Sequence, residues 1–172
     1  VLSPRLDDLQ CVHAALAAFV EKKPKEYVNV LAVFDNEEVG STTAQGADST
    51  FLKDTIGRVS EALGWSEGEK GRKLAESFLI SEDNAHAVHP NHPEKSDLSN
   101  RPYLGGGIVI KYHGSQKYTT DGVSAAMMKL WCEKAKVAYQ TFYNRSDMVG
   151  GSTLGNISNS QLSVTSVDIG LP

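Results

Sequence analysis

Two adjacent glutamates, Glu37 and Glu38, follow a short apolar run that ends at Phe34. Adjacent carboxylates repel each other, and burying a charge is costly unless the charge is paired or bound to a cation. In an extended chain, neighbouring side chains point to opposite sides, so one carboxylate could bind a metal ion while the other takes a proton from water. The pair indicates a hydrolytic metal site rather than a glycosidase, whose two carboxylates must flank a sugar. Each single carboxylate, Asp7 included, has a simpler alternative as a helix cap or a solvated loop charge.

A second group of side chains with metal-binding chemistry lies in residues 81–92. Asp83, His86, His89 and His92 together offer the mixed oxygen and nitrogen ligands of a divalent metal site. The segment belongs to a long, proline-containing loop, and such loops in compact domains are often functional. The alternative is a polar loop whose histidines form structural hydrogen bonds.

The elements that must position these residues can be read from the apolar pattern. In chain order we expect a helix at 6–20, a strand at 28–34, a helix at 47–63 ended by Gly64, strands at 77–81 and 108–112, a helix at 122–135, a strand at 138–143, a glycine- and serine-rich loop leading into a short helix at 150–159, and a strand at 163–169. The alternation of strands and helices predicts an α/β fold, a three-layer sandwich around a mostly parallel, mixed sheet. Ligands of such folds gather beyond the carboxyl ends of strands, so the two acidic segments could converge there.

Composition excludes several classes of partner. The 172 residues carry a net charge of −4 without a basic stripe, which gives no reason to expect a nucleic-acid partner. The sequence contains no apolar run near the roughly 20 residues needed to span a membrane and no secretory signal, so no membrane partner and a cytoplasmic location are predicted. Cys11 and Cys132 match no metal or redox spacing and are predicted to be free thiols. His92 and His113 are expected at the surface.

Five motifs together resemble one known family. PRLDD, FDNEEVGS, DNAHAVHPN, VIK and GGSTLG occur here in the order seen in the aspartyl aminopeptidase family of zinc metallo-aminopeptidases. The resemblance covers essentially the whole chain, and it implies a zinc-exopeptidase-like fold. It also implies an enzyme that removes N-terminal aspartate or glutamate from peptide substrates. The cofactor would be two divalent metal ions, zinc in most members, with manganese or cobalt as alternatives.

The resemblance implies a role for each of seven residues. Asp7 would bridge the two ions, Glu38 would bind one of them and Asp83 the other, while Glu37 would be the general base. The remaining three would contact the substrate: His86, Lys111 and Tyr118. A lysine suits a substrate with an acidic first residue, because Lys111 could pair with its carboxylate. For His89 the resemblance implies a structural role.

The chain also departs from the family pattern. The family has two further metal-binding histidines, one upstream of PRLDD and one after the final GLP, and neither occurs in these residues. We therefore interpret residues 1–172 as a segment of one metallopeptidase catalytic domain, with the upstream part, an inserted second domain and the C-terminal end outside it. The complete protein would form a homo-oligomer, a dodecamer in the family. The alternatives are a catalytically incomplete scaffold segment and a related aminopeptidase of broader specificity.

Overall fold

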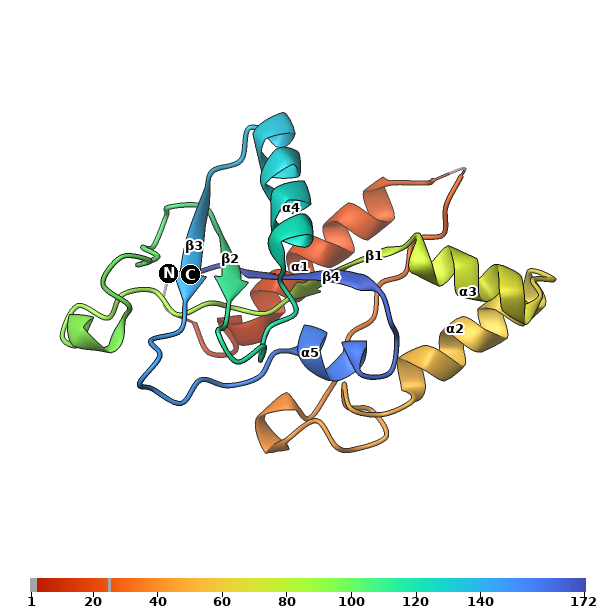
Figure 1. Ribbon diagram of the computed structural model, residues 1–172, viewed down its shortest axis with the longest axis horizontal. Coiled ribbons are helices and arrows are strands. Elements are labelled where there is room, and N and C mark those ends of the chain that lie inside the picture. The colour runs from red at the N-terminus through yellow and green to blue at the C-terminus, as the bar shows by residue number, and fades with distance from the viewer. Residues whose placement is uncertain (1–2, 25) are drawn as a thin grey trace.

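The computed structural model describes residues 3–24 and 26–172, and within them the chain forms a four-stranded mixed sheet between helices (Figure 1). The strand order is β1-β4-β2-β3, in which β1 pairs parallel with β4 and β2 parallel with β3, while β2 and β4 are antiparallel. The predicted α/β class with a mixed sheet is confirmed. The strands are β1 (Phe78–Glu82), β2 (Ile108–Tyr112), β3 (Tyr139–Tyr143) and β4 (Thr165–Gly170).

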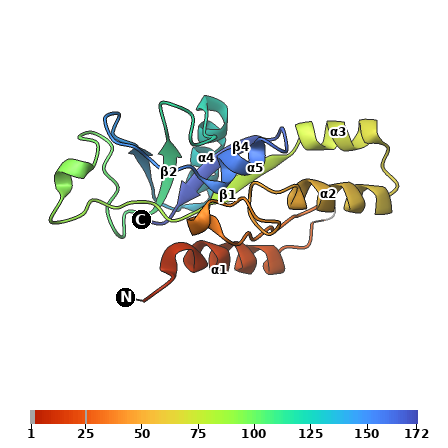
Figure 2. The ribbon, with the colours of Figure 1, turned by 90° about the horizontal axis from the view of Figure 1, so that it is seen from below.

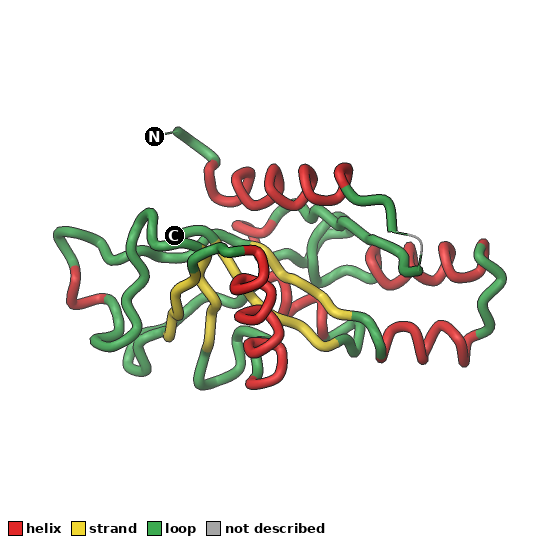
Figure 3. Tube along the Cα trace, turned by 90° about the horizontal axis from the view of Figure 1, so that it is seen from above, coloured by secondary structure: helices red, strands yellow, loops and turns green. Residues whose placement is uncertain are grey.

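Helices cover both faces of this sheet. The helices are α1 (Leu6–Glu21), α2 (Phe51–Ala62), α3 (Glu67–Ala75), α4 (Gly122–Ala135) and α5 (Leu154–Asn159), with single 3-10 turns η1 (Glu37–Val39) and η2 (Pro93–Lys95). In Figure 1, α4 stands above the sheet and α5 lies below it. Figures 1 and 2 show α2 and α3 projecting together beyond β1, and Figure 3 shows α1 running beside the sheet. None of the helices in the described residues is long and apolar enough to cross a membrane.

Alternation along the strands gives the two faces different characters. On the α4 face, Ile110, Val167 and Ile169 form an apolar cluster with Ala125 of α4. The opposite face carries buried polar side chains at its centre: Lys111 on β2, Ser81 on β1, and Ser166 and Asp168 on β4. Buried polar groups need hydrogen-bond partners, so this face of the sheet is stabilised by hydrogen bonds rather than by apolar packing.

Helix boundaries follow local capping signals. Helix α2 ends at Ala62, two residues before Gly64, whose φ of +75° is the left-handed conformation expected of a glycine at this position. Helix α3 was not predicted, although Ser66 and Glu69 form a capping box that the sequence displays. Asp121 caps α4 by accepting a hydrogen bond from the Ser124 amide at 2.7 Å. Both cysteines are free and buried, which confirms the prediction of free thiols.

The predicted strand at 28–34 is wrong. This segment forms no strand, because within the described residues no neighbouring strand pairs with it. Val28, Val30 and Val33 are each more than half exposed, whereas Phe34 packs with Ala32 against the apolar cluster between α2 and the start of β4. A run of valines has the side chains of a buried strand, but a strand also requires backbone partners.

Candidate active site

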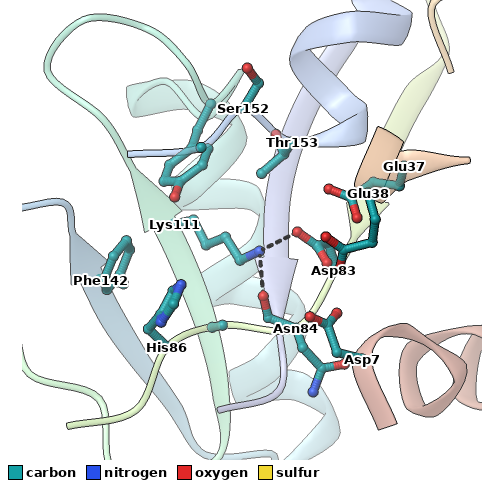
Figure 4. A pocket seen from close by; sticks show the side chains of 13 residues that line it. Asp7, Glu37, Glu38, Asp83, Asn84, His86, Lys111, Phe142, Ser152 and Thr153 are labelled. Carbon is teal, nitrogen blue, oxygen red and sulfur yellow. Dashed lines mark hydrogen bonds and ion pairs between the residues drawn. The ribbon is translucent and has the colours of Figure 1, made fainter. Parts of the chain in front are cut away.

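A cavity of about 160 Å³ gathers the seven residues to which the family resemblance assigns a role in the site (Figure 4). Its lining includes, from five separate parts of the chain, Asp7, Glu37, Glu38, Asp83, His86, Lys111 and Tyr118. The expected convergence of the two acidic segments is therefore present. The cavity does not lie simply at the carboxyl ends of strands, because β2 runs antiparallel to β4 and Lys111 enters from within β2.

Glu37 and Glu38 lie in the 3-10 turn η1, not in an extended chain as expected. The turn begins because Asn36 adopts a left-handed conformation, with φ +61°, and its side chain donates a hydrogen bond to Thr43 Oγ1 at 2.9 Å. Gly40, with φ +105°, ends it. As a result both carboxylates line the same cavity instead of pointing to opposite sides.

The metal-binding potential of the cavity lies in its carboxylates. Oxygen atoms of Asp7, Asp8 and Asp83 lie within 4.8 Å of one another. Asp7 reaches this position because its dihedral angles depart from the helical values at the start of α1. Glu38 lines the same cavity but is not in this tight group, in which Asp8 takes the third place. The sequence analysis gave Asp8 no role in the site, although its position beside Asp7 was an available signal.

The electrostatics of the cluster favour an added positive charge. Burial raises the pKa of Asp7, and repulsion from Asp83 adds to this effect. Burial also raises the pKa of Glu37, with repulsion from Glu38 as the next cause. The pKa of Asp8 rises to about 6, again chiefly through burial. Carboxylates with these neighbours bind protons more tightly than isolated ones, and a bound cation would compensate their charge.

These donors fit a divalent cation. Carboxylate oxygens are accepted by zinc, manganese and cobalt, and the mutual repulsion among Asp7, Asp8 and Asp83 is relieved by a positive ion. The Oδ1 atom of Asp8 is also buried without a hydrogen-bond partner in the described residues. The group contains oxygen donors alone, so an imidazole ligand would have to come from elsewhere.

Lys111 is engaged more fully than the sequence suggested. Its Nζ lies 3.2 Å from Asp83 Oδ2 and donates to the Asn84 carbonyl at 2.9 Å (Figure 4). The residue is 3% exposed. Two of the three ammonium donors are thus already used by the protein, which leaves one for a ligand.

Tyr118 presents a protonated phenol to the cavity. Burial, followed by the negative charges of Asp168 and Asp83, raises the pKa of Tyr118 to about 12. The phenol therefore keeps its proton throughout the neutral range and can donate a hydrogen bond. Lys111 Nζ lies 5.8 Å from the ring centroid, at the outer limit of a cation–π contact.

The histidines of residues 81–92 do not form one metal site with Asp83. His86 lines the cavity, but His89 and His92 do not, and their rings lie 5.2 Å apart in contact with each other. His89 Nδ1 accepts a hydrogen bond from the Asn91 amide, and His92 pairs with Glu94, so the alternative of a loop with local hydrogen bonds describes these two.

His92 is exposed as predicted, but His113 is not a surface residue. It is only partly exposed, its Nδ1 accepts from the Ser115 amide, and its ring meets Tyr118 edge-on at 5.4 Å.

Several cavity residues were missed by the sequence reasoning. They are Asn84, Ala85, Phe142, Gly151, Ser152 and Thr153. Asn84 adjoins Asp83, and the last three belong to the glycine- and serine-rich loop, so composition offered a signal for these. Phe142 is one residue of β3 and offered none.

Comparison with known families gives one match across the chain. A family model described as "Aminopeptidase I zinc metalloprotease (M18)" matches residues 1–172. Two curated proteins named "Probable M18 family aminopeptidase 2" are similar over 172 residues, with 51% identity for the protein of Clostridium novyi and 49% for that of Clostridium acetobutylicum. Both alignments include 100% of this chain but 40% of the relative, so the chain spans about two-fifths of these relatives.

Solved structures give the same picture. A structure of the Ape4 and Nbr1 complex matches with a TM-score of 0.90 and 38% identity, covering 98% of this chain and 33% of that chain. A structure described as the S. cerevisiae mApe1 dodecamer matches with a TM-score of 0.79 and 27% identity, covering 98% of this chain and 38% of that chain. The fold of the described residues is therefore that of solved aminopeptidases.

Proposed function

Because this chain belongs to the M18 family of zinc metalloproteases, we propose that it supplies the carboxylate-bearing part of the active site of a metal-dependent aminopeptidase. The observation that carries the proposal is the convergence of Glu37 with the carboxylates of Asp7 and Asp83 in one cavity. The chain spans about 40% of its curated relatives, so the proposed activity is that of the full-length protein.

In the proposed mechanism the carboxylates divide the work. Asp7, Glu38 and Asp83 would hold two divalent ions, which the family description suggests are zinc, with manganese or cobalt as alternatives. When bound, such ions polarise the scissile carbonyl and lower the pKa of water. Glu37 would take the proton of the attacking water and return it to the leaving amine. The pKa of Glu37 is raised, mainly by burial, which makes its carboxylate a stronger proton acceptor.

We further propose a preference for an acidic first residue. Lys111 and Tyr118 are donors on the cavity wall, and Lys111 keeps one ammonium proton beyond those used by Asp83 and Asn84. A substrate carboxylate placed there would receive charge-assisted hydrogen bonds. His86, which is exposed at the cavity, would contact the peptide from the solvent side.

Assembly completes the proposal. One similar structure is described as a dodecamer, and we propose that the full-length protein is likewise a homo-oligomer. The missing imidazole ligands and the second domain would lie in the remainder of the protein. The competing function, a scaffold segment without catalysis, shares this fold and would not depend on Glu37.

The test uses the full-length protein with and without Glu37→Gln, and Glu76→Gln at the exposed end of α3 as the matched control. Metal content is measured by elemental analysis, and turnover with aminoacyl substrates that begin with Asp, Glu, Asn or Leu. We expect all three proteins to bind metal, and Glu37→Gln alone to lose at least roughly 100-fold in kcat. Equal rates for Glu37→Gln and the parent would remove Glu37 as the base. Equal rates for acidic and neutral substrates would replace the acidic preference with broad specificity.

A further inference from the structure

Asp168 is a fully buried carboxylate in the middle of the sheet, and the mechanism above does not use it. It lies on β4 opposite Ser81 of β1 in the parallel register, on the polar face of the sheet. An ionisable side chain in such a place is costly unless its oxygens accept hydrogen bonds. The partners of Asp168 therefore show what the residue does.

Those partners come from two loops that are distant in sequence. Asp168 Oδ2 accepts from the backbone amide of Thr119 at 2.5 Å and from its hydroxyl at 2.7 Å. Asp168 Oδ1 accepts from the hydroxyl of Thr153 at 2.6 Å. The Asp168 amide in turn donates to Thr120 Oγ1 at 2.9 Å. One side chain thus fastens residues 113–121 and residues 150–153 to the same strand.

Both loops form walls of the cavity. The first loop contributes Tyr118, the immediate neighbour of Thr119, and the second contributes Gly151, Ser152 and Thr153 itself. Figure 4 shows Ser152 and Thr153 on the side of the cavity opposite His86. The two loops have no regular structure of their own at these residues, so their separation depends on tertiary hydrogen bonds.

The packing around Asp168 leaves little room for a different arrangement. A Cβ atom on Gly155, at the start of α5, would lie 2.6 Å from Asp168 Oδ1 and 2.8 Å from Ser81 Cβ. The helix that follows the second loop therefore approaches the carboxylate as closely as a glycine allows. A shift of Asp168 would be transmitted to the loop and to the helix together.

We propose that Asp168 is a positioning residue of the candidate active site, which holds Tyr118 and Thr153 at a fixed separation by binding both of their loops. The consequence for catalysis rests on the proposed function, whereas the joint fastening of the loops is a property of the chain itself. Asp168 does not touch the reacting atoms. It acts through the residues that line the cavity.

The two consequences are measured separately in the full-length protein. Asp168→Asn is nearly isosteric but uncharged: its amide oxygen accepts weaker hydrogen bonds from Thr119 than the carboxylate does, and its NH₂ group cannot accept from Thr153. Thr119→Val removes one hydroxyl from the carboxylate, and Thr119→Ser keeps it. Thr165→Val, on the exposed start of β4, is the matched control.

The first readout is amide hydrogen exchange and needs no activity. Asp168→Asn should speed exchange in both 113–121 and 150–155 by on the order of tenfold, while exchange in β2 stays at the parent rate. The Thr165→Val control should exchange at the parent rate in both loops. Faster exchange in one loop only, or in neither, would overturn the joint fastening. Should Asp168→Asn fail to fold, Thr119→Val and Thr153→Val decide in its place. The proposal stands if exchange rises in 113–121 for the first and in 150–155 for the second, with Thr119→Ser restoring the parent rate, and it falls otherwise.

The second readout is steady-state kinetics with the best aminoacyl substrate. Asp168→Asn and Thr119→Val should each lower kcat/KM on the order of tenfold, and Thr119→Ser should recover most of the loss. An active parent with unchanged kcat/KM in both variants would overturn the positioning role. An inactive parent would instead refute the proposed function, and the exchange result would still stand.

Discussion

Replacing Asp8 by asparagine should stabilise the metal-free protein at neutral pH. Asp8 is half-buried beside Asp7 and Asp83, and its Oδ1 is buried without a hydrogen-bond partner in the described part of the chain. Burial is the main cause that raises its pKa from 3.8 to about 6. A folded-state pKa above the unfolded value means that the native state binds the proton more tightly. The stability that comes from the protonated form is complete below pH 3.8 and is lost as the pH rises through 6.

The size of the effect follows from the two pKa values. The difference between 3.8 and about 6 corresponds to roughly 3 kcal/mol, at about 1.4 kcal/mol per pKa unit. Asp8 is only partly buried, and solvent reduces the penalty, so we expect a gain of about 1–2 kcal/mol for Asp8→Asn at pH 7.5. At pH 4 the parent is largely protonated at Asp8, and the gain should nearly vanish. Bound metal should reverse the order, because the ionised carboxylate is then favoured.

The assay is urea unfolding of the full-length protein after chelation, at pH 4 and pH 7.5, for the parent and Asp8→Asn. Asp97→Asn is the control with the opposite sign, because the Ser99 and Asn100 amides hold the pKa of that partly exposed carboxyl below its ordinary value. That control should lose stability at pH 7.5. Two results would refute this account of the carboxylate cluster. In one, Asp8→Asn is less stable than the parent at pH 7.5 without metal; in the other, it changes the free energy of unfolding by the same amount at both pH values.

Three further substitutions test other parts of the structure. Lys111→Met should lower the free energy of unfolding by roughly 2–4 kcal/mol in urea titrations without metal, because it leaves Asp83 unpaired; an unchanged midpoint would contradict the ion pair. Gly155→Ala should cost roughly 1–3 kcal/mol in the same assay, since its Cβ would press on Asp168, and a neutral result would mean that α5 can move aside. Asp121→Ala should cost about 1 kcal/mol through the lost cap of α4, measured against Asp121→Asn, which should retain most of the stability.

The parts of the fold that the sequence predicted are those fixed by local signals. The apolar stripe of α4 and its start after Asp121, and the end of α2 before Gly64, depend on residues a few positions apart. Helix α3 was missed because its nine residues are mostly charged or small, although the Ser66 capping box was present. Residues 28–34 were assigned wrongly because pairing of strands is decided by distant segments, which apolar content does not report.

The site shows the same division. Resemblance brought together seven residues that do line one cavity, but their side-chain chemistry depends on the fold. The pairing of Lys111 with Asp83 joins residues 28 positions apart and reflects the antiparallel placement of β2. The sequence gives no signal for Asp168, because it is a single acidic residue in an apolar strand. Its role follows only from the structure, in which Thr119 and Thr153 of two different loops both donate hydrogen bonds to it.

The exposed run at 28–34 gives the neighbouring acids a second effect. A valine-rich segment that pairs with no strand of the described residues can template intermolecular β-pairing, and charges that flank such a run act as gatekeepers against aggregation. Asp35, Glu37 and Glu38 occupy the gatekeeper positions directly after this run. The substitution Glu37→Gln therefore also weakens this protection, because residues 28–34 lose one of the negative charges that flank them. Sedimentation of Glu37→Gln beside the parent would separate a lost proton acceptor from a lost gatekeeper.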